Sequence, residues 1–97
     1  MSYTLHSGAE RDIANALDFY VEQAGLVVAE RFLAEFERVT QLLLAYPDLG
    51  APMPSGRRTF ALKVFPYSIV YRNLASGLQI LIVRHQHRKP NYAQNRR

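Results

Sequence analysis

Residues 78–85 read LQILIVRH, and the four consecutive apolar residues 80–83 within this stretch decide the fold class. A strand that is covered on both faces shows an unbroken apolar run, whereas a strand with one solvated face alternates apolar and polar residues. We therefore expect residues 78–85 to form a strand in the middle of a sheet.

Two alternating stretches precede this strand. Residues 67–72 and 59–64 each place apolar side chains at every second position, which is the period of a strand, and Phe65-Pro66 separates them. The inward set is expected to comprise Tyr67, Ile69 and Tyr71 in one strand and Phe60, Leu62 and Val64 in the other. Residues 47–56 are rich in Pro and Gly and lack periodicity, so they are expected to form a loop.

The first half of the chain shows helical periodicity. Apolar residues recur at helical spacing over 9–24 and again over 27–46, where the stripe includes Phe32, Phe36, Val39, Leu43 and Tyr46. Ser7 and Glu10 have the spacing of a capping box, and Gly25 and Pro47 are natural stops. Two amphipathic helices joined by a short Gly turn predict an antiparallel hairpin.

These elements together predict an α+β fold. The short segment Tyr3–Leu5 can add one strand before the helices, which gives the order β-α-α-β-β-β. The helix hairpin should cover one face of a mostly antiparallel sheet, with three antiparallel strands following it, and the other face should stay accessible. The length of 97 residues predicts one domain over residues 1–97.

Composition excludes several functional classes. The chain has no Cys and only three His, without a zinc-ligand pattern, and it contains no Gly-rich phosphate loop, nucleophile elbow or zinc-protease helix. We therefore expect no metal and no cofactor. The N-terminus lacks the features of a signal peptide, and no apolar run is long enough to span a bilayer, so a cytoplasmic protein without a membrane partner is expected.

Charge is distributed unevenly along the chain. The formal net charge is +4, yet residues 1–50 hold all eight acidic side chains, and residues 57–97 hold nine basic ones and no acidic one. This asymmetry predicts one basic face, suited to a polyanion or an acidic protein. The plainer interpretation is a solvated basic surface that keeps a small domain in solution. Likewise, Arg96 and Arg97 could be a frayed tail, and His85 is expected to pack in the sheet.

Three segments carry a resemblance to a known family. They are Arg57-Arg58, the stretch FPYSIVYR at 65–72 and the stretch IVRHQHRKPNY at 82–92. Together with the early helix residues Ala9, Asp12, Ile13 and Tyr20, they resemble the RelE/ParE toxin superfamily over nearly the whole chain. The resemblance implies the toxin of a type II toxin–antitoxin system, associated with growth arrest and plasmid stabilisation. It also implies an acidic cognate antitoxin, expected along the helix hairpin and a sheet edge.

The superfamily has two branches with different targets. RelE-like members cleave messenger RNA in the ribosome and are endoribonucleases, whereas ParE-like members inhibit DNA gyrase without a ribonuclease site. A ribonuclease needs groups that move protons and stabilise a phosphorane. The candidates for those roles are Arg58, Arg72, His87, Arg88 and Tyr92.

Two positions favour the ParE-like branch. Ser68 stands where RelE-like ribonucleases carry arginine, and Gln86 stands where another basic residue is expected. For a gyrase inhibitor, the candidate target-binding residues are Arg57, Arg58, Lys63, Arg84, Arg88, Lys89 and Tyr92. A third possibility is a basic module that binds nucleic acid through its arginines and stacks bases on its tyrosines.

Overall fold

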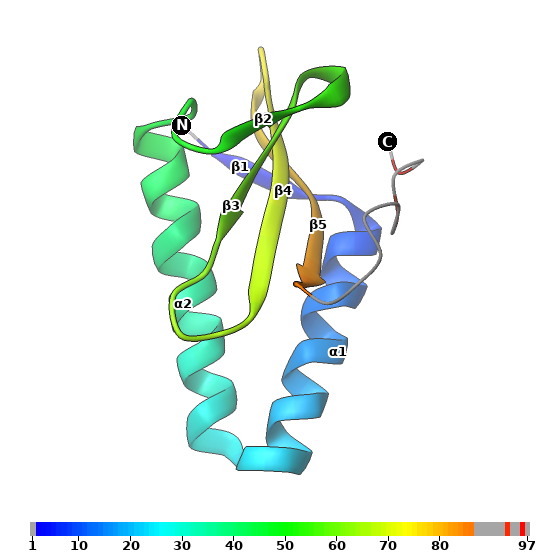
Figure 1. Ribbon diagram of the computed structural model, residues 1–97, viewed down its shortest axis with the longest axis vertical. Coiled ribbons are helices and arrows are strands. Elements are labelled where there is room, and N and C mark those ends of the chain that lie inside the picture. The colour runs from blue at the N-terminus through cyan, green and yellow to red at the C-terminus, as the bar shows by residue number, and fades with distance from the viewer. Residues whose placement is uncertain (1, 87–92, 94–95, 97) are drawn as a thin grey trace.

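The computed structural model describes residues 2–86, 93 and 96. The chain begins with β1 (Tyr3–Leu5) and continues into the helices α1 (Ser7–Ala24) and α2 (Leu26–Ala45). Then come the short strand β2 (Ala51–Met53), a 3₁₀ turn (Pro54–Gly56) and the strands β3 (Arg57–Ala61), β4 (Tyr67–Leu74) and β5 (Gly77–His85). Figure 1 shows the two helices joined by a short turn at one end and the strands lying over the open end of the hairpin.

The strands form one five-stranded mixed sheet in the order β1-β5-β4-β3-β2. Strand β1 runs parallel to β5, and the other neighbours are antiparallel. The predicted α+β fold is therefore confirmed, including the N-terminal strand, the helix hairpin and the three antiparallel strands after it. Strand β5 lies between β1 and β4, in the interior position that its apolar run predicts.

The prediction of a loop over residues 47–56 is wrong in part, because β2 lies inside it. Ala51, Pro52 and Met53 pair with residues 59, 58 and 57 of β3, respectively. Strand β2 is at the sheet edge, where a proline is tolerated because its missing N–H faces no further strand. Strand β2 forms because it pairs with β3, and this pairing leaves no periodic pattern in the sequence.

The start of α1 also differs from the prediction. His6, not Ser7, is the N-cap, and its Nδ1 accepts a hydrogen bond from the Gly8 N–H at 2.9 Å. The backbone N–H of His6 donates to the Ile80 carbonyl at 2.9 Å, so the pairing of β1 with β5 extends to His6. The His6 ring then lies at the first turn of α1. The imidazole nitrogen thus satisfies one of the free amides at the helix start.

The main core lies between the helix hairpin and the sheet. Phe32, Phe36, Val39 and Leu43 are buried as predicted, but Tyr46 is 63% exposed because α2 ends at Ala45. Val64 is also outside the core, since β3 ends at Ala61 and the chain turns outward. An aromatic cluster joins both helices to the β3–β4 loop and β4, with ring centroids 5.2–6.2 Å apart; it contains Tyr20, Phe32, Phe65 and Tyr67.

A bulge in β5 alters the packing on the sheet face that points away from the helices. Val70 pairs with Ile82, whereas the next residue, Tyr71, pairs with Ile80, so Leu81 is the additional residue. Val70, Leu81 and Ile82 form a second buried cluster, against which Met53 and Ala93 pack. The expectation that the sheet face away from the helices stays accessible is therefore wrong at this cluster.

Candidate functional site

The strand register decides which basic side chains share a face. Paired residues of neighbouring strands point to the same side, and successive residues of one strand point to opposite sides. Arg84 pairs with Ser68, one residue from the core residue Ile69, and Arg72 directly follows the buried Tyr71. Both therefore lie on the face away from the helices, which we call the outer sheet face.

The two neighbouring arginines of β3 point to opposite faces. Arg58 pairs with Tyr71 and so faces the helices, whereas Arg57 lies on the outer sheet face. The prediction of one basic face thus holds for Arg57, Arg72 and Arg84 and is wrong for Arg58. The alternation of β3 was visible in the sequence, but the register that assigns each arginine to a side was not.

Arg58 is occupied by the backbone of the loop before β2. Its Nη1 donates to the carbonyls of Gly50 at 2.8 Å and Asp48 at 3.2 Å, and its guanidinium lies 3.7 Å from the Asp48 carboxylate. Tyr71 holds the same loop, since its hydroxyl donates to Pro47 O at 2.7 Å and accepts from Gly50 N at 2.9 Å. Burial raises the pKa of Tyr71, which keeps this hydroxyl protonated.

The ribonuclease candidates are not brought together among the described residues. Arg58 and Arg72 lie on opposite sides of the sheet, and one phosphodiester cannot contact both sides at once. Arg72 donates from Nε to Gln79 Oε1 at 2.8 Å, so it too has a partner within the sheet. His87, Arg88 and Tyr92, like the target-binding candidate Lys89, lie outside the described residues.

The outer sheet face combines arginines with the second buried cluster. Arg57 and Arg84 are half-buried and lie on β3 and β5, the strands on either side of β4. Val70 of β4 and Leu81 and Ile82 of β5 form the second buried cluster. Arg57 donates from Nη2 to the Arg96 carbonyl, and its Nε is buried without a partner among the described residues. This face therefore places half-buried cationic groups beside a buried apolar cluster, and the cationic groups suit contact with an acidic protein surface.

Arg96 is anchored, contrary to its interpretation as part of a frayed tail, and Arg97 lies outside the described residues. Its Nη1 donates to Asp12 Oδ2 at 2.7 Å and to Leu81 O at 3.1 Å. The guanidinium also packs against Gly8, where any Cβ would overlap it. A residue near the end of the sequence is thus fixed to both α1 and β5.

Asp12 is the partner that the sequence analysis did not assign. It is only 7% exposed, and its Oδ2 also accepts from the Val83 N–H at 3.0 Å. Strand β1 pairs with β5 only as far as Ile80, so Asp12 and Arg96 provide hydrogen bonds to the β5 backbone beyond that point. The signal was an acidic residue on the buried stripe of α1, between Ala9 and Ile13.

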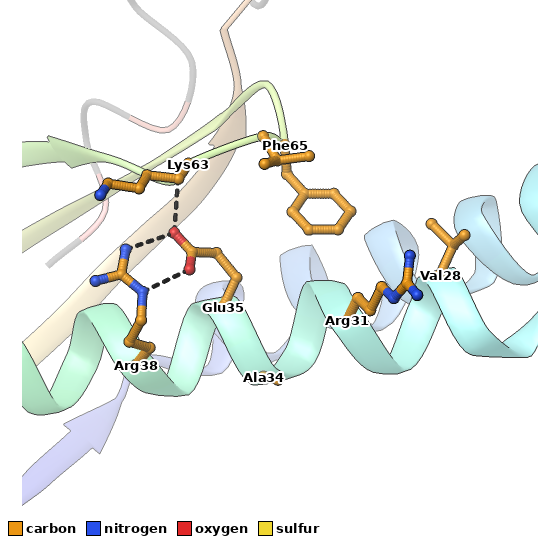
Figure 2. Close-up of a pocket in the computed structure, with 8 residues that line it drawn as sticks. Val28, Arg31, Ala34, Glu35, Arg38, Lys63 and Phe65 are labelled. Atoms are coloured by element: carbon orange, nitrogen blue, oxygen red, sulfur yellow. Dashed lines mark hydrogen bonds and ion pairs between the residues drawn. The ribbon is translucent and has the colours of Figure 1, made fainter.

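A groove of about 630 Å³ lies between α2 and the β3–β4 loop, and we call it the α2 groove (Figure 2). In Figure 2 the Phe65 ring points down onto α2 between Glu35 and Arg31. The groove is lined by Val28, Arg31, Ala34, Lys63, Val64 and Phe65, together with Glu35 and Arg38. The sequence did not indicate this groove, because the alternation over residues 59–64 predicts an inward-pointing Val64 at the end of a strand.

Glu35 joins the two walls of the α2 groove. Its two carboxylate oxygens accept from Arg38 at 2.7 and 2.9 Å, and Oε2 accepts from the backbone N–H of Lys63 at 2.7 Å. Hydrogen bonds from Arg38 in the first place, and from the Lys63 backbone, hold the pKa of Glu35 below its usual value. The loop that carries Lys63 is therefore tied to α2 by an ionised carboxylate.

His85 packs as expected, edge to face against Tyr67 with 5.2 Å between the ring centroids. Among residues 2–86, 93 and 96, no group of three His, Cys, Asp or Glu could hold a metal ion. No helix in this described part is long and apolar enough to cross a bilayer.

Comparison with known proteins identifies the family. The family model described as the ParE toxin of the type II toxin–antitoxin system parDE matches residues 3–91. The chain is similar to the protein named Toxin ParE2 in two strains of Mycobacterium tuberculosis, CDC 1551 / Oshkosh and ATCC 25618 / H37Rv. Each is 29% identical over 87 residues, which cover 90% of this chain and 83% of the relative.

A solved structure gives the same assignment. The chain resembles a structure titled "Chromosomal ParDE TA system from P. aeruginosa", with a TM-score of 0.77 and 26% identity. The match covers 88% of this chain and 95% of that one. With residues 3–91 matching the family model and the same helix hairpin and sheet in this relative, the chain belongs to the ParE toxin family of type II toxin–antitoxin systems.

Proposed function

We propose that this ParE-family toxin acts in the cytoplasm, inhibits DNA gyrase and is neutralised by an acidic cognate antitoxin. One observation carries the choice of gyrase over messenger RNA. Arg58 and Arg72, the two described members of the ribonuclease set, lie on opposite faces of the sheet, and Arg58 is bound to the loop before β2. A non-enzymatic toxin that acts by binding fits this arrangement better than an endoribonuclease does.

The outer sheet face is the proposed contact with gyrase. Arg57 and Arg84 present cationic groups on either side of β4, and the candidates Arg88, Lys89 and Tyr92 follow β5 directly in the sequence. Arginine and tyrosine are the residues that most often carry binding energy at protein interfaces. Arg58, by contrast, is assigned a supporting role, because its guanidinium holds the loop carbonyls.

The formal net charge of +4 supports an acidic antitoxin as the partner. The edge strands β1 and β2 leave backbone groups on their outer sides, which an extended antitoxin segment could pair with. Neutralisation is then a binding event that needs no chemistry on the toxin.

The test is a supercoiling assay with purified chain and purified gyrase, run beside a ribosome-dependent messenger RNA cleavage assay. We expect loss of gyrase activity, intact messenger RNA and recovery of supercoiling when the antitoxin is added. Arg84→Ala should weaken inhibition, whereas Arg11→Ala, a matched change at an exposed arginine of α1, should not. Transcript cleavage with unaffected gyrase would overturn the proposal.

A further inference from the structure

Asp12 and Arg96 form a buried ion pair whose geometry extends beyond the core. Their side chains are 4% and 15% exposed, respectively. Taking two charges out of water costs free energy that their attraction returns only in part, and well-packed apolar residues at such positions are often as stabilising. A buried pair therefore points to a role in fixing the geometry of its neighbours, and here one neighbour belongs to the outer sheet face.

Arg96 connects helix α1 with the outer sheet face. Its guanidinium donates from Nη1 to Asp12 Oδ2 on α1 and to the Leu81 carbonyl of β5. Its backbone carbonyl accepts a hydrogen bond from Nη2 of Arg57 on β3. Strand β4 lies between β5 and β3, so this one residue links the buried acid of α1 with an arginine two strands away.

The position of Arg96 is restricted at both its side chain and its backbone. The guanidinium packs against Gly8, where any Cβ would overlap it. The Arg96 N–H donates to the Ala93 carbonyl at 3.0 Å, and Ala93 packs against the second buried cluster. The carbonyl that Arg57 contacts is therefore held in place from two directions.

This carbonyl restricts Arg57 before any partner binds. A long side chain that becomes ordered only on binding weakens the affinity by roughly two- to tenfold. Arg57 is half-buried and already makes one hydrogen bond. Its guanidinium has five N–H donors, so this bond leaves donors for an acceptor on a partner. Arg57 is thus an interface arginine whose conformation is largely fixed in the free toxin.

We propose that Asp12 and Arg96 are positioning residues for gyrase inhibition. The Asp12 carboxylate holds the Arg96 side chain, and the Arg96 carbonyl in turn holds Arg57 in the conformation that contacts gyrase. Asp12 is only 7% exposed, so it acts through Arg96 and not by touching gyrase. This inference rests on the proposed function and adds to it two residues outside the predicted target-binding set.

The experiment measures the concentration that half-inhibits gyrase supercoiling. Arg96→Met keeps the backbone carbonyl at this position and removes its anchor on Asp12. Asp12→Asn is the second variant, since it keeps an acceptor for the Val83 N–H. The matched controls are Arg11→Met, the same change at an exposed arginine of α1, and Leu43→Ala, which destabilises the core at α2. All variants are assayed at a temperature where circular dichroism shows them fully folded.

The decisive comparison is made in a second background, Arg57→Ala. We expect Arg96→Met and Asp12→Asn each to raise the half-inhibiting concentration about fivefold, and Arg57→Ala to raise it about tenfold. Because Arg96 acts through Arg57, adding Arg96→Met to Arg57→Ala should raise the concentration less than about twofold further. Both controls should stay within about twofold of wild type.

A multiplicative loss in the double variant would overturn the proposal, since Arg96 would then act independently of Arg57. Unchanged inhibition by Arg96→Met would overturn it too, as would an equal loss in Leu43→Ala, which would indicate a general effect of stability.

A second measurement needs no gyrase. NMR relaxation of the Arg57 Nε–H group should show its order parameter falling below about 0.6, the range of flexible groups, in Arg96→Met but not in Arg11→Met. An unchanged order parameter in Arg96→Met would contradict the positioning of Arg57. If the wild-type chain does not inhibit gyrase, the proposed target is wrong, and the NMR comparison still decides whether Arg96 positions Arg57.

Discussion

Asp12 and Arg96 should be strongly coupled in the stability of the protein. The Asp12 side chain is 4% exposed and the Arg96 side chain 15%, and their Nη1 and Oδ2 atoms lie 2.7 Å apart. Asp12→Ala leaves a buried guanidinium without its counter-ion and the Val83 N–H without its acceptor. Removing one partner of a buried pair costs about 3–5 kcal/mol, and an orphaned buried amide about 1–3 kcal/mol. Both hydrogen bonds end on Asp12 Oδ2, so the two costs are not fully additive. We expect the free energy of unfolding to fall by about 3–4 kcal/mol.

The assay is urea unfolding of a double-mutant cycle. Arg96→Met keeps much of the aliphatic volume and leaves the Asp12 carboxylate with the Val83 N–H, so we expect a loss of about 2–3 kcal/mol. The double variant has no unpaired charge, and its loss should fall short of the sum of the single losses by about 1–3 kcal/mol. For a domain of this size, the Asp12→Ala loss corresponds to a Tm decrease of about 12–30 °C. Additivity within about 0.5 kcal/mol, or an Asp12→Ala loss below about 1 kcal/mol, would refute the buried pair.

Four further outcomes are expected. Tyr71→Phe removes a buried hydroxyl that both donates to and accepts from the loop before β2, and urea unfolding should show a loss of about 1–3 kcal/mol. Val64→Gly should leave stability unchanged or raise it by up to about 1 kcal/mol, since left-handed strain is relieved against the entropy cost of glycine; a clear loss in urea would contradict the strain. The hydrogen bonds from Arg38 lower the pKa of Glu35 in the folded state, so ionised Glu35 stabilises the fold fully above the unfolded pKa near 4.5. This stabilisation is lost as the pH falls through the lower folded pKa. Glu35→Gln should therefore reduce the fall of Tm at acid pH, measured by thermal unfolding across a pH series. Arg84→Ala should raise the concentration needed for half-inhibition of gyrase about tenfold, a change of about 1.4 kcal/mol, and an unchanged value would remove Arg84 from the contact.

Hydrophobic periodicity was sufficient to predict the helices and strands that bury a continuous stripe of apolar side chains. The predicted helices over 9–24 and 27–46 and the strand over 78–85 match the observed elements to within two residues at each end. These stretches have many apolar positions that all point to the same core, so local pattern and tertiary packing agree.

Features that depend on a partner far along the chain were not visible in this way. Strand β2 exists because Ala51–Met53 pairs with β3, and no side-chain pattern reports that pairing. The observed N-cap is His6 and not the predicted Ser7, because the parallel pairing of β1 with β5 fixes where the chain leaves the sheet. In both cases the backbone of another strand decides the local structure.

The candidate site was predicted by residue type but not by geometry. Composition correctly located the basic residues in the second half of the chain, and a resemblance to known toxins indicated the family. Alternation along β3 places Arg57 and Arg58 on opposite sides of the sheet, and only the register of β3 against β4 assigns each arginine to its side. The α2 groove escaped prediction for a related reason, since the alternation that includes Val64 continues past the end of β3.

The β5 bulge accounts for several of these differences together. With Leu81 as an additional residue, the β5 backbone beyond Ile80 changes its direction of hydrogen bonding, and Leu81 O and Val83 N point to the edge that β1 no longer covers. Buried backbone groups need partners, and Asp12 and Arg96 provide them. The same bulge places Leu81 and Ile82 side by side on the outer sheet face, where Ala93 packs over them. One extra residue in a strand therefore determines both why α1 carries a buried acid and why Ala93 and Arg96 lie against the face proposed to contact gyrase.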